Sequence, residues 1–362
     1  MTAPRRFRQD HLDPARTTGL ILCGMGGPDG PDAVEPFLRN LFQDPQIIPI
    51  PRLLSPLLGR LIARRRAPAV RRRYLEMDQG GGSPQVPTTR AQGDRLAALL
   101  SAAGRPTLAQ PAMRYWRPYP DEAVRSLRER GAEQFLILPM YPQYSDATNG
   151  STLTFVQEAL DRLAPDAAVH VVEAWHLLDG FVATLAANAG RGLLRWAGEG
   201  ADPRDCALIY VAHSLPESFV KRGDPYLSQT RATVSAVHER VRSALGAAGH
   251  ADWLARLPGG TSPLLAFQSK VGPIKWLGPE ITAETRRLAE AGCRRLLVQP
   301  VSFTCEHIET LHELDLELRR EAEALGVQDF ARGAALNLDE TWLASLAARL
   351  AGEPFHAEAA RV

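Results

Sequence analysis

The chain has 362 residues, of which 45% are hydrophobic and 23% are charged, and this ordinary composition excludes a disordered protein. The 42 basic and 41 acidic residues leave a formal net charge of +1, which argues against a nucleic-acid-binding protein because phosphates attract a basic surface. At about 150 residues per domain, the length predicts roughly two domains.

Short apolar, β-branched runs alternate with helical patterns along the chain. We expect strands at residues 18–24, 107–113, 134–140, 168–174, 206–212, 262–268, 294–301 and 328–335. Amphipathic stretches predict helices at residues 88–103, 120–130, 226–247, 279–291 and 306–325. Near-continuous apolar strands separated by helices indicate parallel sheets covered on both faces, and ligands bind such sheets beyond the carboxyl ends of the strands.

The two halves of the chain resemble each other in sequence. LILCGMGGP (20–28) aligns without a gap with LIYVAHSLP (208–216), which places Met25 opposite His213. RGAEQFLILPMYP (130–142) matches AGCRRLLVQPVSF (291–303) in the same way. The repeat predicts an α/β fold of two similar Rossmann-like domains that face each other across a ligand cleft.

The expected domains follow from this repeat. The first Rossmann-like domain spans residues 18–175 and the second spans residues 176–335. Residues 1–17 are expected to form an N-terminal extension, and residues 336–362 a C-terminal helix and tail.

An apolar segment rich in Leu, Ile and Pro interrupts the first domain at residues 47–66, and further arginines follow at 71–73. Two interpretations remain open. The segment is either a core helix that ends in a solvated basic turn, or an apolar lip beside a basic cluster. Such a lip would contact a membrane surface or grip a flat apolar anion.

The cysteines and the N-terminus bear on the compartment. Cys23, Cys206, Cys293 and Cys305 lack C-x-x-C spacing, which favours buried reduced thiols over a disulfide framework or a metal cluster. The first residues have no apolar core of a secretory signal, and no apolar run approaches the roughly 20 residues that span a bilayer. We therefore expect a cytoplasmic protein.

The glycine-rich stretch GMGGPDG (24–30) departs from a dinucleotide-binding loop. Asp29 occupies the place of the third glycine, and Pro28 breaks the turn into the following helix. This spacing disfavours a nicotinamide cofactor.

His213 follows a buried strand in the motif VAHSLP (211–216). An imidazole at a strand end accepts a proton or ligates a metal, although a histidine in this place is also a common structural hydrogen-bonding residue. Its neighbour Ser214 does not lie in the G-x-S-x-G motif of a hydrolase nucleophile.

An acidic stretch follows the strand that ends near Phe303. We expect Glu306 and His307 to open a helix, on which Glu309 and Glu313 lie four residues apart on one face. In a cleft the repulsion between the two carboxylates raises the pKa of at least one of them. A row of carboxylates beside a histidine is suited to accepting protons or to passing a divalent cation. The alternative interpretation is that these carboxylates form a solvent-exposed acidic face of a helix.

Aromatic residues follow several other predicted strands: Tyr115, Trp116, Tyr141, Tyr144 and Trp276. They either plug a domain interface or form, with Met25, a flat apolar slot that has Arg114 at its rim as an anion site.

Several long motifs, in order along residues 18–350, resemble those of the ferrochelatase family. They are GMGGP (24–28), GGGSP (80–84), YPQYS (141–145), AHSLP (212–216), GDPY (223–226), QSKVGPIKWLGP (268–279) and HIETLHELD (307–315). The resemblance implies a fold of two chelatase-type domains with a porphyrin between them. It also implies insertion of ferrous iron into that porphyrin to make haem.

The resemblance also implies roles for individual residues. His213 matches the histidine assigned to porphyrin deprotonation and proposed as a metal ligand, and Glu309 matches the opposing carboxylate, here expected to be the second ligand. Glu313 matches the next carboxylate of the acidic path, His307 the histidine that links this path to the site, and Met25 the methionine on the opposite porphyrin face. The implied pocket residues are Phe303, Tyr115, Tyr141 and Arg114, and those near the propionates are Arg65, Arg66 and Ser83.

The departures from the family pattern concern the cofactor and the substrate. Members with a [2Fe–2S] cluster have a cysteine where Asp146 stands, and no cysteine follows Cys305, so we expect neither this cluster nor another tightly bound cofactor. Members that act on coproporphyrin typically have Tyr in place of Met25, so Met25 and the lip favour protoporphyrin IX, which yields protohaem and two protons.

Three alternatives stay open at this point. They are a coproporphyrin III ferrochelatase, a chelatase for another metal and tetrapyrrole, and a non-catalytic porphyrin carrier. The expected partners are porphyrin and Fe²⁺ as substrates, with peripheral membrane contact through the lip. The oligomeric state stays open.

Overall fold

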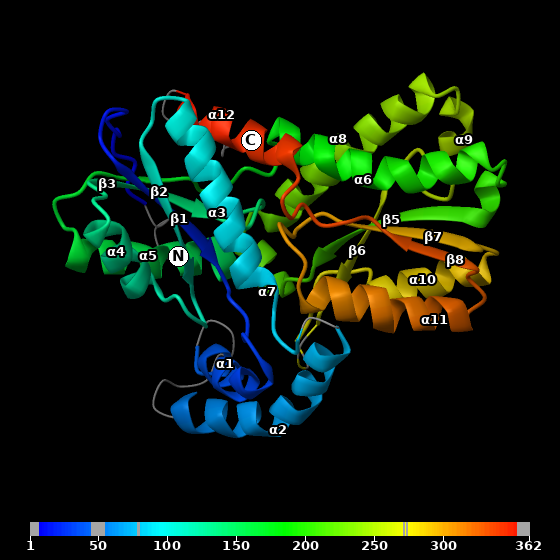
Figure 1. Ribbon diagram of the computed structural model, residues 1–362. Coiled ribbons are helices and arrows are strands. Elements are labelled where there is room, and N and C mark those ends of the chain that lie inside the picture. Colours follow the sequence, from blue (N-terminus) through cyan, green and yellow to red (C-terminus); the bar gives the residue numbers. More distant parts are fainter. Residues whose placement is uncertain (1–6, 45–54, 78–79, 271, 273, 353–362) are drawn as a thin grey trace. The chain divides into compact units, whose positions relative to one another are not determined.

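The computed structural model describes residues 7–44, 55–77, 80–270, 272 and 274–352 (Figure 1). They form two compact units. The first unit contains the described residues up to Trp175 together with those from Leu343 onward, and the second is His176–Trp342.

The first unit is built on a parallel four-stranded sheet of order β2-β1-β3-β4. The strands are β1 Thr18–Gly24, β2 Thr107–Met113, β3 Gln134–Pro139 and β4 Val169–Val171. The helices are α1 Val34–Phe42, α2 Ser55–Glu76, α3 Gln85–Ala102, α4 Pro120–Glu129 and α5 Ser151–Leu163, with a 3₁₀ turn at Pro31–Ala33 and a π-helical turn at Asp146–Gly150. Residues before β1 add to the sheet edge, where Gln9 pairs with His170 of β4.

Both faces of the central strand β1 are buried because its side chains alternate between two helical layers. Ile21 and Cys23 pack in one core with residues of α4 and α5. On the other face Leu22 lies against Gly93 of α3, where an added Cβ would come within 2.7 Å of it. This accounts for the continuous apolar sequence of the strand.

The second unit repeats the same topology, with strand order β6-β5-β7-β8. Its strands are β5 Cys206–His213, β6 Leu264–Gln268, β7 Arg295–Pro300 and β8 Asp329–Arg332. Its helices are α6 Asp179–Gly198, α7 Glu217–Lys221, α8 Tyr226–Ala247, α9 Ala251–Ala255, α10 Ile281–Glu290, a π-helix at Glu309–Leu318, α11 Arg319–Ala324 and α12 Glu340–Ala351, with a 3₁₀ turn at Pro203–Asp205.

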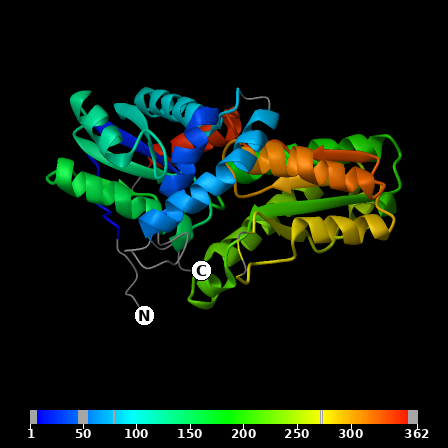
Figure 2. The ribbon, with the colours of Figure 1, turned by 90° about the horizontal axis from the view of Figure 1, so that it is seen from below.

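Helices cover both faces of this second sheet. Helices α6 and α8 lie on one side in Figure 1, and α10 and α11 lie on the other. The view from below shows α10 and α11 flanking the strands (Figure 2). Ile209 and Val211 of β5 pack with Leu314 of the π-helix, which fixes this helix against the sheet.

The sequence repeat corresponds to matched hydrogen bonds in the two units. The Met140 N–H donates to the Cys23 carbonyl at 2.8 Å, and the Val301 N–H donates to the Val211 carbonyl at 2.9 Å. After α4 and α10, Gly131 and Gly292 adopt the left-handed conformation that ends a helix, with φ of 96° and 102°. The predicted α/β fold with two similar helix-covered parallel sheets is confirmed.

The predicted strands all form, with ends that shift by a few residues. The largest differences are in the strands expected at 168–174 and 328–335, which are limited to Val169–Val171 and Asp329–Arg332. The stretch 306–325 is not one regular α-helix. Glu306 and His307 precede the helix, a π-helix occupies Glu309–Leu318, and only Arg319–Ala324 is α-helical.

Part of the expected lip, residues 47–54, lies outside the described residues. The described remainder belongs to α2, which packs against α1, and a Cβ added to Gly59 would lie 2.9 Å from the carbonyl oxygen of Phe42 at the end of α1. Leu57 and Leu61 point away from this contact and are 75% and 64% exposed. A core helix is therefore wrong for this part of the segment. Among the described residues, no helix is both long and apolar enough to cross a membrane.

Candidate functional site

His213 is the last residue of the central strand β5, where the parallel sheet opens at its carboxyl edge. Its backbone N–H donates to the Ser302 hydroxyl at 3.1 Å, and its carbonyl accepts from the Tyr226 hydroxyl at 2.8 Å. The ring Nδ1 lies 2.7 Å from the Ser214 carbonyl. A carbonyl oxygen can accept a hydrogen bond but cannot donate one, so Nδ1 must be the donor. In the neutral ring Nδ1 therefore carries the proton, and Nε2 keeps its lone pair.

Glu313 is held by the end of the neighbouring strand β6. Its Oε2 accepts hydrogen bonds from the Gln268 amide at 3.0 Å and from the Ser269 hydroxyl at 2.5 Å. The same Gln268 amide donates to the Glu309 carbonyl at 2.8 Å. Ser269 has a φ of 65°, an uncommon conformation for a residue other than glycine. Two neutral donors thus fix this carboxylate without neutralising its charge.

Glu309 pairs with His307 instead. Nδ1 of His307 lies 3.0 Å from Oε2 of Glu309, an ion-pair distance. The His307 ring also packs edge to face on Phe303, with ring centroids 4.2 Å apart. Thr310 fixes the backbone at this point, because its hydroxyl accepts from the His307 N–H at 3.1 Å.

The two carboxylates have opposite electrostatic environments. Burial opposes ionisation of Glu309, but the positive charges of His307 and His213, when protonated, outweigh it and lower the pKa of Glu309 to about 2. For Glu313, burial and the nearby Glu309 charge raise the pKa above its usual range, although the hydrogen bonds from Ser269 and Gln268 oppose this. One carboxylate is a persistent anion, and the other takes up a proton more readily.

The second unit thus brings together five of the residues expected from the sequence. They are His213, Phe303, His307, Glu309 and Glu313. Trp276 lies near the same strand end, because it bridges to Pro216 in the loop after β5. Gln268 and Ser269 are site residues that our sequence reasoning missed, although their place at the end of a predicted strand was an available signal.

In the first unit the loop after β1 is tightly packed. Gly26 has a φ of 81°, and a Cβ on Gly27 would lie 2.5 Å from the Ser83 Cβ. The Ser83 N–H donates to the Pro28 carbonyl at 2.7 Å, and the Met25 carbonyl accepts from the Tyr115 N–H at 3.0 Å. The glycines therefore permit close packing between the loop after β1 and the loop that contains Ser83. This packing brings Ser83 close to the carboxyl end of β1, where Met25 also lies.

Arg114 differs from the expected open anion site at a rim. Its side chain is 4% exposed and forms an ion pair with Asp44, which is 10% exposed. The Tyr115 hydroxyl donates to the same Asp44 oxygen at 2.6 Å and accepts from Arg114 Nε at 2.7 Å. The guanidinium also lies over the Phe155 ring at 4.1 Å. Asp44 thus already neutralises the charge that was expected to bind an anion.

The remaining expected pocket residues are spread over the first unit. Asn149 holds the backbone of Tyr141 by donating to its carbonyl at 3.1 Å. Arg65 and Arg66 are exposed on α2, and the Arg66 guanidinium lies 5.3 Å from the centroid of the Phe42 ring. The predicted cleft between the two domains, which would join these residues to His213, stays a prediction.

The four cysteines are buried thiols, and burial raises the pKa of each. Within the described part of the chain, no group of three or more His, Cys, Asp or Glu side chains is arranged to hold a metal ion.

Comparison with known proteins places the chain in a family. The family model described as Ferrochelatase matches residues 17–353. The chain belongs to the ferrochelatase family. It is a metal chelatase of the lyase class, and the family reaction is metal insertion into a porphyrin in haem synthesis.

Individual relatives agree with this assignment over nearly the whole chain. A ferrochelatase of Geotalea uraniireducens is 38% identical over 331 residues, covering 91% of this chain and 96% of its own length. A ferrochelatase of Gloeobacter violaceus is 38% identical over 334 residues, covering 91% of this chain and 95% of its own length. The chloroplastic ferrochelatase-2 of Cucumis sativus is 34% identical, covering 91% of this chain and 62% of its own length.

A solved structure shows the same fold at low sequence identity. It is a multi-domain protein of Deinococcus radiodurans described as structurally similar to chelatases. It aligns with a TM-score of 0.50 and 14% identity, covering 95% of this chain and 56% of its own.

Proposed function

We propose that the chain inserts ferrous iron into protoporphyrin IX and releases protohaem and two protons. The observation that carries this proposal is the arrangement at the strand ends of the second unit: His213 of β5 lies beside Gln268 of β6, and the Gln268 amide holds both the Glu313 carboxylate and the Glu309 backbone. A free porphyrin has two inner N–H protons that must leave as the metal enters. The site offers both a proton acceptor and fixed negative charge for a divalent cation.

In this proposal His213 is the proton acceptor. Its Nε2 lone pair is available because Nδ1 donates to the Ser214 carbonyl, and the contacts to Ser302 and Tyr226 fix the backbone that carries the ring. A positioned base of this kind typically contributes about 10²–10⁴-fold to a rate. His213 and Glu309 are also the proposed ligands of the entering Fe²⁺, since imidazole and carboxylate are ordinary ligands of first-row metals.

Glu309 and Glu313 have different roles in this proposal. Glu309 stays ionised, with a pKa of about 2, and supplies the negative charge that attracts Fe²⁺. Glu313 has a raised pKa and takes protons from the site, with His307 as the link beside Glu309. On this view Met25, Ser83, Tyr115, Tyr141, Phe303 and Trp276 contact the porphyrin, whereas Arg114 acts through Asp44 rather than on a propionate.

The assignment of protoporphyrin IX as the substrate is tested by comparing it with coproporphyrin III in the same assay. Protoporphyrin has two propionates and two apolar vinyl groups, whereas coproporphyrin III has four propionates. The apolar Met25 therefore favours protoporphyrin, and we expect its kcat/KM with Fe²⁺ to exceed that of coproporphyrin III by about 10-fold or more. Metal insertion is followed by the change in porphyrin absorbance.

The same assay separates the alternatives. Faster insertion into coproporphyrin III contradicts the substrate assignment but keeps the reaction. Insertion of cobalt or nickel in strong preference to iron indicates a different chelatase. Tight porphyrin binding without turnover of any metal indicates a carrier and contradicts the proposed function.

We also propose that the protein is cytoplasmic and contacts membranes peripherally through the lip. In support, Leu57 and Leu61 are exposed on α2 beside the exposed Arg60 and Arg64. Apolar side chains flanked by arginines favour an anionic membrane surface.

The membrane contact is tested by sedimentation with phosphatidylglycerol vesicles. We expect the wild-type protein to sediment with the vesicles and the L57S/L61S variant to stay largely in solution. Leu177 is also exposed, at 53%, and L177S is the matched control that should sediment like the wild type. Equal sedimentation of all three proteins would contradict the contact.

A further inference from the structure

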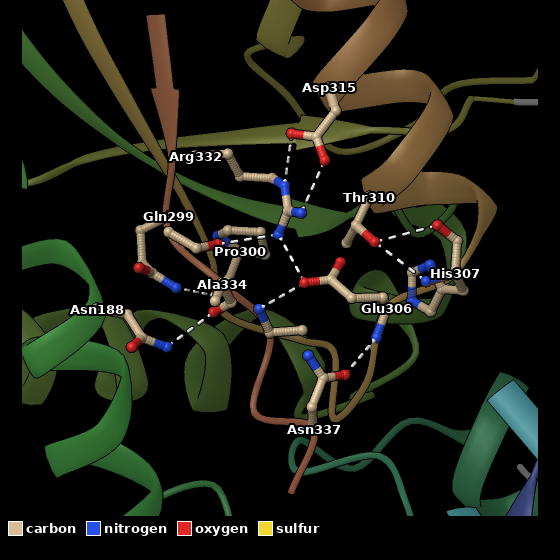
Figure 3. A network of polar contacts seen from close by, with 12 residues as sticks. Asn188, Gln299, Pro300, Glu306, His307, Thr310, Asp315, Arg332, Ala334 and Asn337 are labelled. Atoms are coloured by element: carbon tan, nitrogen blue, oxygen red, sulfur yellow. Dashed lines mark hydrogen bonds and ion pairs between the residues drawn. The ribbon is translucent and has the colours of Figure 1, made fainter. Parts of the chain in front are cut away.

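Arg332, the last residue of β8, contacts two carboxylates of the acidic stretch at once (Figure 3). Its Nε and Nη2 donate to the two oxygens of Asp315, each at 2.8 Å. Its Nη1 donates to Oε1 of Glu306 at 3.0 Å. The side chain is 10% exposed, so this fork is largely shielded from water. A planar guanidinium makes such bidentate contacts, and a lysine ammonium does not.

The two contacted residues flank the proposed working carboxylates. Glu306 comes before the π-helix, whereas Asp315 lies within it, beyond Glu309 and Glu313. Burial alone would raise the pKa of Glu306, but the Arg332 charge outweighs it and holds the pKa below its usual range. Glu306 and Asp315 are thus committed to an arginine, whereas Glu309 and Glu313 are held by His307, Gln268 and Ser269.

Backbone contacts make this end of the sheet rigid. The Ala335 N–H donates to the same Glu306 oxygen as Arg332, at 3.0 Å. The Glu306 N–H donates to the Asn337 side chain, also at 3.0 Å. Asn188 of α6 donates to the Ala334 carbonyl at 2.9 Å, so the segment after β8 is fixed in turn. The start of the acidic stretch is therefore tied to β8 and to the segment that follows it.

The π-helix needs contacts of this kind to keep its conformation. A π-helix is rare because its i→i+5 hydrogen bonds are less favourable than those of an α-helix, and it usually extends over a single turn. Here it extends over ten residues, Glu309–Leu318. If this segment relaxed to an α-helix, Glu309 and Glu313 would rotate relative to each other and to His213. The contacts of Arg332 with Glu306, before the π-helix, and with Asp315, within it, oppose this change.

We propose that Arg332 is a positioning residue for metal insertion: its fork joins Glu306 to Asp315 and so holds the π-helix in the register that aims Glu309 and Glu313 at the site. The inference rests on the proposed function, and Arg332 acts through the helix without touching the substrate. Loss of a group that orients ligands typically costs about 10–100-fold in activity or metal affinity.

Two variants of the full-length protein separate position from charge. Arg332→Lys keeps the positive charge but loses the fork. The triple variant R332M/E306Q/D315N removes all three charges, so that no buried charge is left without a partner. For both we expect a folded protein with a kcat about 10- to 100-fold below wild type and a nearly unchanged KM for porphyrin. Hydrogen exchange followed by mass spectrometry should show faster exchange confined to the peptide 306–318.

The matched control is Arg195→Lys, because Arg195 contacts the same strand through Asp329 at 2.8 Å but lies away from the π-helix. It should keep wild-type kcat and exchange. A folded variant, lysine or triple, with a kcat near the wild-type value would overturn the proposal, and so would unchanged exchange at 306–318 in both variants. A wild-type protein that inserts no metal contradicts the proposed function instead, and this is seen before any variant is compared.

Discussion

Replacing His213 by alanine is expected to lower kcat for iron insertion by about 10²–10⁴-fold, because the site loses its proton acceptor. Porphyrin affinity should change little, since a flat macrocycle binds mainly through apolar contacts with its pocket. Turnover is measured from the absorbance change, and binding from the quenching of porphyrin fluorescence. The two readouts together distinguish loss of chemistry from loss of the site.

Two controls sharpen the His213 experiment. Added imidazole should restore part of the activity of the alanine variant, because it can occupy the vacated volume and accept the proton. His250→Ala removes a half-buried histidine at the start of α9, outside the site, and should leave kcat unchanged. Turnover of His213→Ala near the wild-type value would remove this residue from the mechanism.

The strand ends of the second unit were predictable because they depend on local sequence patterns. A buried apolar run that stops at His213 predicts a residue at the open edge of a parallel sheet. The repeat also predicts that Met25 and His213 are equivalent positions, and both lie at the carboxyl ends of central strands: Met25 directly follows β1, and His213 is the last residue of β5. Glu309 and Glu313 could be placed near each other because helices of either kind bring residues four apart onto nearby positions.

The contacts that hold these residues were not predictable in the same way. The sequence does not predict the π-helix, because a short apolar pattern fits both a turn of 3.6 residues and a wider one. Asp44 and Arg114 pair across 70 positions of the chain, and Asp315 and Arg332 across 17, with no spacing signal in either case. Charge pairs of this kind depend on the finished fold, so the sequence predicts an open anion site at Arg114 where the structure has a buried ion pair with Asp44.

Replacing Glu309 by glutamine is expected to lower kcat by about 10²–10³-fold, because removal of one preorganised charge typically has this effect. The variant should also change the pH dependence. The Glu309 charge helps to raise the pKa of Glu313, so its removal lowers that pKa. Since Glu313 must be ionised to take up a proton, the acid limb of the kcat profile should move to lower pH. A limb that stays in place or moves upward would contradict the coupling between the two carboxylates.

Acid stability offers an independent test of the same residue. The folded-state pKa of Glu309 is about 2, below its ordinary value of 4.5, so its ionisation favours the folded state. The contribution is present above pH 4.5 and is lost as the pH falls towards 2, and it amounts to about 3 kcal/mol. The Glu309→Gln variant lacks it, and its free energy of unfolding in urea should fall less steeply than that of the wild type between these two pH values.

Glu313, whose folded-state pKa is raised, contributes with the opposite sign: its ionisation costs stability as the pH rises. Identical acid dependence in the variant and the wild type would mean that the His307 pair does not hold Glu309 as a persistent anion, and the proposed division between an anion and a proton carrier would fail with it.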